Sequence, residues 1–279
     1  RACRRRKAGI HAMMKEPYSF RVAGGIAVIA FATVFSAQAQ MSNVAFGGYE
    51  PEPAICITPQ ERAEAEAKIA ANITTLQAAG RMPSAQAQRR ASPPQLGWPI
   101  QASASNTDYG FHGLSAFPDQ NTNAASMFDF NCGARTYDGH RGTDFFLWPF
   151  YWWKMDHDEV QVIAAAPGTI TYKTDGNYDR YCSANSATGN MLVITHADGS
   201  SIWYGHMKNG SLTAKGVGET VVEGEYLGVV GSSGSSTGPH LHFEPHDASN
   251  RSIDPWQGAC NALATNSWWR SQRPYYDSA

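Results

Sequence analysis

From about residue 95 onward, the chain consists of short runs rich in β-branched and aromatic residues, separated by Gly, Asn, Asp and Ser. Each run has the length of a strand, and helical periodicity is nearly absent from this region. The runs lie at 160–165, 169–173, 191–195, 201–206, 220–222, 226–230 and 240–244. The pattern predicts an all-β domain of antiparallel strands.

A hairpin is expected in the middle of this domain. Residues 191–195 and 201–206 flank Ala197-Asp198-Gly199-Ser200, whose Asp-Gly pair is typical of a tight turn between antiparallel strands. The turn would fix the register and set His206 at the far end of the second strand. His196 lies beside the turn, where we expect a surface position.

The region before residue 95 has a different character. Thr58-Pro59-Gln60-Glu61 is a capping box with proline at the first helical position, and it predicts a helix that continues to Ala79 and ends at Gly80. The apolar stripe of this helix is narrow, so it either packs on the main domain or serves as a solvated spacer. Residues 83–94 have the composition of a linker. We therefore expect a helix and linker at 40–94 and a domain boundary near residue 95.

The first residues resemble a secretory signal. Basic residues precede the apolar run 22–35, and Ser36-Ala-Gln-Ala39 satisfies the small-x-small rule for cleavage. We expect a cleaved signal peptide at 1–39, with residues 1–12 upstream of the true start at Met13 or Met14. The apolar run is shorter than the roughly 20 residues of a transmembrane helix, so we expect no stable membrane anchor.

Composition narrows the range of partners. The chain has 279 residues, of which only 16% are charged, and its formal net charge is −2. A nucleic-acid-binding protein would carry a basic stripe, whereas the basic cluster at 4–7 belongs to the segment that cleavage would remove. We expect no nucleic acid as a partner. None of these features predicts the oligomeric state.

Cysteine usage fits export. Cys3 would leave with the signal, and the mature chain would keep Cys56, Cys132, Cys182 and Cys260. Four thiols in an exported protein predict two disulfides and no free thiol. Three connectivities are open. We favour Cys132–Cys182 and Cys56–Cys260, because both cysteines of the first pair lie in loops of the β domain.

One strand-like run carries two histidines, in His240-Leu241-His242. In an extended chain, side chains two residues apart leave the same face, roughly 6–7 Å from each other, and Leu241 would point into the core. Two imidazoles on one face suit a divalent metal site, or a metal ligand beside a general base. Two unrelated surface histidines are the alternative.

Two further motifs supply partners for this pair. His140-Arg-Gly-Thr-Asp144 offers an imidazole and a carboxylate, and Tyr204-Gly-His206 offers another imidazole after a strand-like run. Residues four apart in a strand are separated by about 13 Å, too far to bind one ion. His140 and Asp144 can therefore share an ion only if the backbone bends, which Gly142 permits.

Taken in this order, the three motifs resemble those of the lysostaphin-like (LytM-type) zinc metalloendopeptidases, which cut peptide bonds in bacterial peptidoglycan. The resemblance spans roughly Leu96 to Pro255 and includes Ser236-Thr-Gly-Pro-His-Leu-His-Phe-Glu244 nearly unaltered. It implies a zinc endopeptidase domain at 95–260 with the lysostaphin-like β fold, of the glucose-permease-like, duplicated hybrid type. An aromatic tail would follow at 261–279.

The resemblance also implies roles for individual residues. His140, Asp144 and His242 would bind Zn2+ and leave the fourth position to water, which a catalytic zinc needs because it lowers the pKa of that water to about 7. His206 and His240 would act on protons and on the oxyanion, in an order that the sequence leaves open. Tyr204 would either pack or donate to the oxyanion.

Other chemistries fit less well. Gly234-Ser-Ser-Thr-Gly238 matches a nucleophile elbow around Ser236, but the prolines at 239 and 245 leave no room for the helix that such an elbow needs. The cluster at 155–159 is a solvated acidic turn, a second cation site or a wall of a substrate groove. No His-Glu-x-x-His motif is present, which argues against a thermolysin-type protease.

We therefore expect a zinc-dependent endopeptidase that is exported to the periplasm or the extracellular space and acts on peptidoglycan cross-links or stem peptides. The alternative is a non-catalytic domain of the same fold, which binds peptidoglycan or activates a separate amidase. Retention of all five candidate site residues favours the enzyme, because degenerate relatives typically lose one of them.

Overall fold

The structure is a computed structural model that describes residues 55–121 and 126–275. These residues all fall within one compact unit, Ala45–Ala279. The expected signal peptide at 1–39 and its cleavage site lie outside them. Among the described residues, no helix combines the length and the apolar character needed to cross a bilayer.

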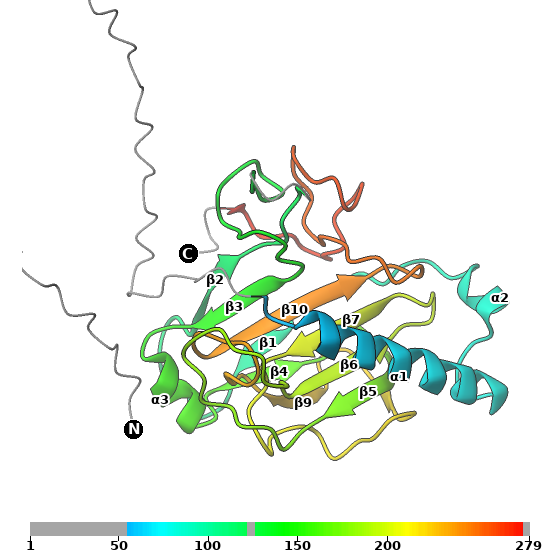
Figure 1. Ribbon diagram of the computed structural model, residues 1–279, viewed down its shortest axis with the longest axis horizontal. Coiled ribbons are helices and arrows are strands. Elements are labelled where there is room, and N and C mark those ends of the chain that lie inside the picture. The colour runs from blue at the N-terminus through cyan, green and yellow to red at the C-terminus, as the bar shows by residue number, and fades with distance from the viewer. Residues whose placement is uncertain (1–54, 122–125, 276–279) are drawn as a thin grey trace, which may run out of the picture. The chain divides into compact units, whose positions relative to one another are not determined.

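The described residues form two antiparallel sheets (Figure 1), which confirms the predicted fold class. The larger sheet has seven strands in the order β2-β3-β10-β7-β6-β5-β8, and the smaller has three in the order β1-β4-β9. The larger sheet comprises β2 (His112–Ala116), β3 (Thr143–Leu147), β10 (His240–His246), β7 (Ser201–Gly205), β6 (Met191–Thr195), β5 (Gly168–Thr174) and β8 (Thr220–Val221). The smaller comprises β1 (Ile100–Ala102), β4 (Val160–Ile163) and β9 (Tyr226–Val229).

Each of the seven predicted runs overlaps a strand of the structure. The strands β1, β2 and β3 were not among them. β2 has the sequence His112-Gly-Leu-Ser-Ala116, which lacks β-branched residues, and it is a strand because β3 pairs with it. Pairing with a distant segment overrides weak local preference.

The main core lies between the two sheets. Tyr204, Leu241 and Phe243 point into it from the larger sheet and are fully buried there. Val160 and Leu227 of the smaller sheet belong to the same cluster. The opposite faces of β7 and β10 therefore point away from the main core, and these faces carry the candidate site.

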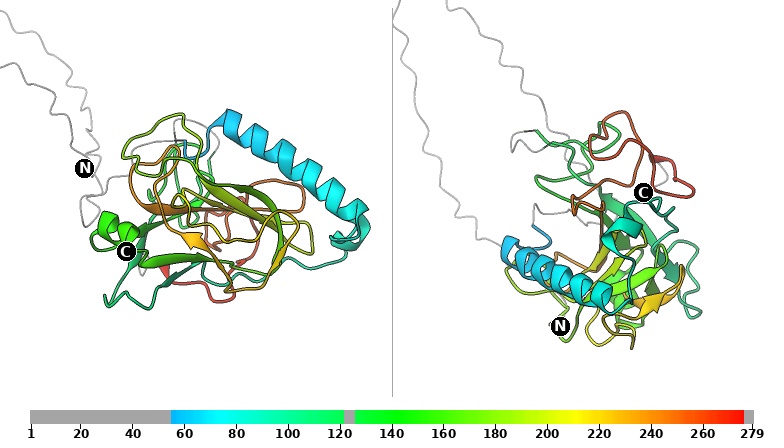
Figure 2. Two further views of the ribbon diagram at one scale, coloured as in Figure 1. Left: turned by 90° about the horizontal axis from the view of Figure 1, so that it is seen from below. Right: turned by 90° about the vertical axis from the view of Figure 1, so that its right-hand side faces the viewer.

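In the described part of the chain, three helices accompany the sheets: α1 (Pro59–Ala78), α2 (Ala85–Gln88) and α3 (Tyr151–Asp156). Thr58 caps α1 through its side chain, which accepts the amide of Glu61 at 3.1 Å, as the capping box predicts. Helix α1 runs along the outer face of the larger sheet (Figures 1 and 2), with Ala65 packed in a cluster that includes Trp203. It is therefore a packed helix and not a solvated spacer.

Two predictions about side chains were wrong. The first concerns the disulfides, since Cys132 pairs with Cys260 and Cys56 is a free, buried thiol. The amide of Cys260 donates to the carbonyl of Phe130 at 2.9 Å, and this contact brings the two loops together. The second concerns His196, which is only 2% exposed because its Nδ1 turns inward to the carbonyl of Pro167 at 2.8 Å.

The segment at the C-terminal end of the described chain packs against the same domain. Trp269 is 3% exposed, lies in the main core and forms a parallel bridge with Leu96. The hydroxyl of Tyr275 donates to the carboxylate of Asp129 at 2.6 Å. These contacts tie the segment 269–275 to Leu96 and Asp129.

Candidate metal centre and active site

The candidate site is built on β10, which lies between β3 and β7 in the middle of the larger sheet. The antiparallel register sets Asp144 of β3 directly opposite His242, and Gly205 of β7 opposite it on the other side. Because side chains alternate along a strand, His240 and His242 leave the face opposite to Leu241. The imidazole pair thus lies between an acidic residue and the end of the Tyr204-Gly-His206 motif.

His140 reaches the site from the loop before β3. Its Nε2 is 3.2 Å from Oδ1 of Asp144, although the two residues are four apart in sequence. The backbone leaves the extended conformation before Thr143, where β3 begins, which provides the bend that the spacing required. Gly142 allows a close approach here, because a Cβ atom on it would lie 2.6 Å from Cε1 of His242.

The tautomers of His140 and His242 follow from their outer partners. Nδ1 of His140 lies 3.1 Å from the carbonyl of Phe117, and Nε2 of His242 lies 3.0 Å from a carboxylate oxygen of Glu244. These oxygens only accept, so each of the two ring nitrogens carries a proton and donates it. In the neutral rings, the lone pairs of the other nitrogens point into the site.

Three acceptor atoms therefore converge. Nε2 of His140 and Nδ1 of His242 are 3.3 Å apart and lie 3.2 and 3.0 Å from the same oxygen of Asp144. The lone pairs of these atoms repel one another, and an extra proton or a bound cation would remove that repulsion. Two imidazoles and a carboxylate, each oriented by an outer hydrogen bond, are a donor set that suits zinc.

Cys56 also lies at this cluster, which sequence reasoning did not foresee. Its sulfur and one ligand atom each of His140, Asp144 and His242 all lie within 4.8 Å of one another. The residue precedes α1, so only the docking of that helix brings the thiol to the site. The pairing of Cys56 with Cys260, favoured above, would have excluded this position.

His206 and His240 form a second pair of imidazoles beside the cluster, with ring centroids 4.6 Å apart. Each directs Nδ1 outward to a backbone carbonyl, that of Ser233 at 2.7 Å and that of Gly238 at 2.8 Å. One ring nitrogen of each lies within 4.8 Å of the Cys56 sulfur. His206 follows the end of β7 and has a left-handed backbone, with φ of 59°, which turns its ring away from the path of the strand.

The site is strongly charged and almost fully buried. Burial opposes ionisation of Asp144, but His140 and His240 outweigh it and keep the pKa of this carboxyl well below its usual range. Burial likewise acts to lower the pKa of His140, yet the Asp144 carboxylate prevails and raises that pKa to about 9. Asp144 therefore remains an anion, and the cluster attracts positive charge.

A buried ion pair between Arg62 and Glu244 lies next to His242 and stabilises its position. The fully buried carboxylate of Glu244 accepts two hydrogen bonds from Arg62, at 2.8 and 2.9 Å, in addition to the bond from His242. It also lies 2.8 Å from Nε2 of His246. Glu244 could have been predicted, since it is two residues from His242 on the same face, whereas Arg62 lies on α1 and shares no local pattern with it.

Tyr137 is a further residue that the sequence did not single out. Its ring stacks on that of His140, with centroids 4.1 Å apart. Its hydroxyl lies 2.6 Å from the Cys56 sulfur and 3.4 Å from Oδ2 of Asp144. Tyr137 thus holds His140 in place and adds a hydroxyl to the edge of the cluster.

Other candidates from the sequence have structural roles. Tyr204 points into the core, where its hydroxyl accepts the amide of Ala165 at 2.9 Å, so it packs and does not face the site. Ser236 is followed by β10 and not by the helix of a nucleophile elbow. In the 155–159 cluster, Asp158 pairs with Lys208 at 2.6 Å and Glu159 with Lys154 at 2.9 Å.

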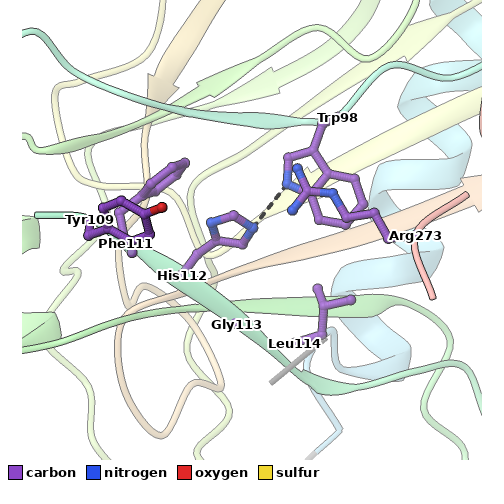
Figure 3. Close-up of a pocket in the computed structure, with 8 residues that line it drawn as sticks. Trp98, Tyr109, Phe111, His112, Gly113, Leu114 and Arg273 are labelled. Carbon is purple, nitrogen blue, oxygen red and sulfur yellow. Dashed lines mark hydrogen bonds between the residues drawn. The ribbon is translucent and has the colours of Figure 1, made fainter. Parts of the chain in front are cut away.

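Two cavities differ in their relation to the cluster. One, of about 390 Å³, opens between the segment around Cys56 and the loop 137–141, with His140 and His242 in its wall. The other, of about 300 Å³, lies at the far end of β2, where Trp98 donates to His112 and Arg273 stacks on the indole (Figure 3). Of these two cavities in the described residues, the first reaches the candidate metal ligands His140 and His242.

Part of the chain is similar to proteins of a known family. Residues 139–255 match the model of Peptidase family M23. Over 84 residues it is 43% identical to DD-carboxypeptidase/endopeptidase Mpg of Neisseria meningitidis, which covers 30% of this chain and 16% of that protein. Over 105 residues it is 29% identical to peptidoglycan DD-endopeptidase ShyC of Vibrio cholerae, which covers 38% of this chain and 19% of that protein.

Among solved structures, the catalytic domain of the antimicrobial peptidase lysostaphin from Staphylococcus simulans is 26% identical, with a TM-score of 0.32. That match covers 56% of this chain and 96% of the lysostaphin domain. The chain matches less than a fifth of the length of each of the two curated relatives named above.

Proposed function

We propose that this chain is a zinc-dependent endopeptidase that hydrolyses peptide bonds in the cross-links or stem peptides of bacterial peptidoglycan. The observation that carries the proposal is the convergence of His140, Asp144 and His242 beside His206 and His240. The match to Peptidase family M23 supports a peptidase, and two similar proteins are named as endopeptidases, one of them of peptidoglycan.

In this proposal Nε2 of His140, an oxygen of Asp144 and Nδ1 of His242 hold the metal. When bound, Zn2+ polarises a carbonyl group and lowers the pKa of a water molecule toward about 7. Glu244 and the carbonyl of Phe117 keep the two ligand rings in the required tautomer. His140 and His242 line the cavity through which a peptide would reach them.

His206 and His240 are assigned to proton handling. Both bind a backbone carbonyl through Nδ1 and turn the other ring nitrogen toward the site. A neutral imidazole in this orientation can accept a proton from water, and the protonated ring can then donate to the leaving amine or to the oxyanion. Replacing either histidine with Ala should reduce turnover by about 100- to 10,000-fold.

We extend the proposal to location. A peptidoglycan substrate lies outside the cytoplasm, and the expected signal peptide at 1–39 provides a route there. The mature chain would act in the periplasm or outside the cell. N-terminal sequencing of the secreted protein should begin near Gln40, and a start upstream of residue 30 would contradict cleavage at Ala39.

The test is hydrolysis of purified peptidoglycan with the metal content of the same sample measured. We expect clearing of a peptidoglycan suspension, loss of clearing with a chelator, and recovery when zinc is restored. The masses of the released fragments would identify the bond that is cut. Peptidoglycan binding without hydrolysis, in the presence of added zinc, would favour the non-catalytic alternative.

A further inference from the structure

Cys56 lies outside the segment that matches the peptidase family, yet its side chain lies inside the site. Its sulfur belongs to a group of four possible ligands with the three proposed metal ligands. It belongs equally to a second group, with the two histidines assigned to proton handling. The sulfur therefore lies within 4.8 Å of a ligand atom of each of these five residues.

The thiol packs in a buried cluster with Ala116 and Tyr137, and its surroundings also suit a metal ligand. Cys56 is 8% exposed and forms no disulfide, and the hydroxyl of Tyr137 contacts its sulfur at 2.6 Å. Nε2 of His206 is grouped with the sulfur, and it is buried without a hydrogen-bond partner among the described residues. His206 is itself 2% exposed, so this nitrogen is an unsatisfied acceptor directed at the same space.

Contacts on both sides of Cys56 fix its position. Ile57 packs in the cluster that includes Trp203 of β7. In the first turn of α1, the carboxylate of Glu61 accepts the amide of Gly189 at 2.8 Å, and Arg62 forms its two bonds to Glu244. Residues 55–62, here called the N-terminal strap, are thus anchored to the sheet that carries the site.

A thiol at this position would change the coordination of a bound zinc. A zinc with three protein ligands keeps a position for water and substrate, whereas a fourth protein ligand closes the site. Thiolate sulfur is a preferred ligand of zinc, and a cysteine that binds releases its proton to solvent. A metal held by His140, Asp144 and His242 would therefore take the nearby sulfur in place of water.

We propose that Cys56 is a fourth ligand of this metal and that the N-terminal strap keeps the peptidase partly latent, with a low basal activity, until it is withdrawn. The proposal deepens the proposed function and rests on it, because it requires a metal at His140, Asp144 and His242. Withdrawal exchanges the sulfur for water and at the same time uncovers His206 and His240. Arg62 leaves Glu244 in the same movement, so the opening is coupled to the support of His242.

The test uses the full chain with cobalt(II) in place of zinc. A thiolate bound to cobalt(II) gives a charge-transfer band in the near ultraviolet, which a site of nitrogen and oxygen ligands lacks. We expect the band in the wild type, its loss in Cys56→Ser with cobalt still bound, and its retention in Gln60→Ala. Gln60 is an exposed residue of the same strap, so it is the matched control.

Two further readouts complete the experiment. In unfolded protein stripped of metal, Cys56 should react with a thiol reagent at once, whereas in the folded metal-loaded protein it should be protected. On peptidoglycan, Cys56→Ser should be about tenfold or more faster than the wild type. Circular dichroism of the variant checks its folding, and the wild-type spectrum alone decides the ligand if the variant fails to fold.

The outcomes separate the two proposals. Cobalt bound to the wild type without the near-ultraviolet band would overturn the role of Cys56 and leave the proposed function standing. Failure of both the wild type and Cys56→Ser to bind any metal would overturn both. A wild type that shows the band but is as active as Cys56→Ser would support sulfur ligation and overturn latency.

Discussion

Replacing Glu244 with Gln should destabilise the protein strongly, because this carboxylate is the common partner of three cationic or proton-donating groups. It is fully buried and bonded to Arg62, His242 and His246 at 2.8 to 3.0 Å. The Arg62 side chain is only 13% exposed, so the variant leaves a mostly buried cation without its charge partner. Breaking one side of such a pair costs about 3–5 kcal/mol.

The measurement is thermal unfolding of the metal-free protein, since bound metal would add its own stabilisation. For a domain of this size each kcal/mol shifts Tm by about 2–4 °C, so Glu244→Gln should lower Tm by roughly 6–20 °C. The matched control is Glu223→Gln, which removes the exposed pair with Arg270 and should cost about 1 kcal/mol or less. Equal effects of the two substitutions would refute the argument from burial.

The same variant has a second expected effect. Glu244 fixes the tautomer of His242, so Glu244→Gln should weaken metal affinity by about 10- to 100-fold. The double variant Arg62→Met with Glu244→Gln should recover part of the lost stability, because it leaves no unpaired charge. Strictly additive losses in the double variant would mean that the two residues do not form the buried pair described here.

Two more predictions concern stability. Burial lowers the pKa of His112 to about 4, with Arg273 adding to the effect, whereas the unfolded value is about 6.5. The unfolded chain therefore binds the extra proton first, so stability is lost as pH falls from about 6.5 to 4, by up to about 3 kcal/mol. His112→Gln should remove this part of the acid profile in equilibrium unfolding, and the exposed His157→Gln should not. Replacing Cys132 and Cys260 with Ser opens a disulfide that joins residues 128 apart, and should cost about 2–5 kcal/mol in denaturant unfolding; an unchanged midpoint would contradict it.

The strands could be predicted from the sequence where their own residues strongly favour the extended conformation. β6 and β7 contain Met191-Leu-Val-Ile-Thr195 and Ser201-Ile-Trp-Tyr-Gly205, whose residues favour a pleated, buried surface, and the turn between them is encoded by Asp198-Gly199. β2 and β3 were not predicted from the sequence, because the strands that pair with them lie far along the chain. The same limit explains the wrong disulfides, which depend on how loops meet.

Some residues of the candidate site could likewise be predicted from local sequence, and others could not. The two-residue spacing of His240 and His242 follows from strand geometry alone, and the bend between His140 and Asp144 follows from the distance that one ion can bridge. Cys56 and Arg62 could not be found, because they reach the site only after α1 docks on the outer face of the sheet. No local sequence pattern predicts a contact between residues 62 and 244.

Zinc content of purified variants, measured by elemental analysis, tests the central claim most directly. We expect about one zinc per chain in the wild type, in His206→Ala and in His240→Ala. We expect zinc to be weakened or lost in His140→Ala, Asp144→Ala and His242→Ala, each of which removes one of three atoms that converge on one point. A His240→Ala protein without zinc, beside a His242→Ala protein that retains it, would contradict the assignment of ligand and proton-handling residues along β10.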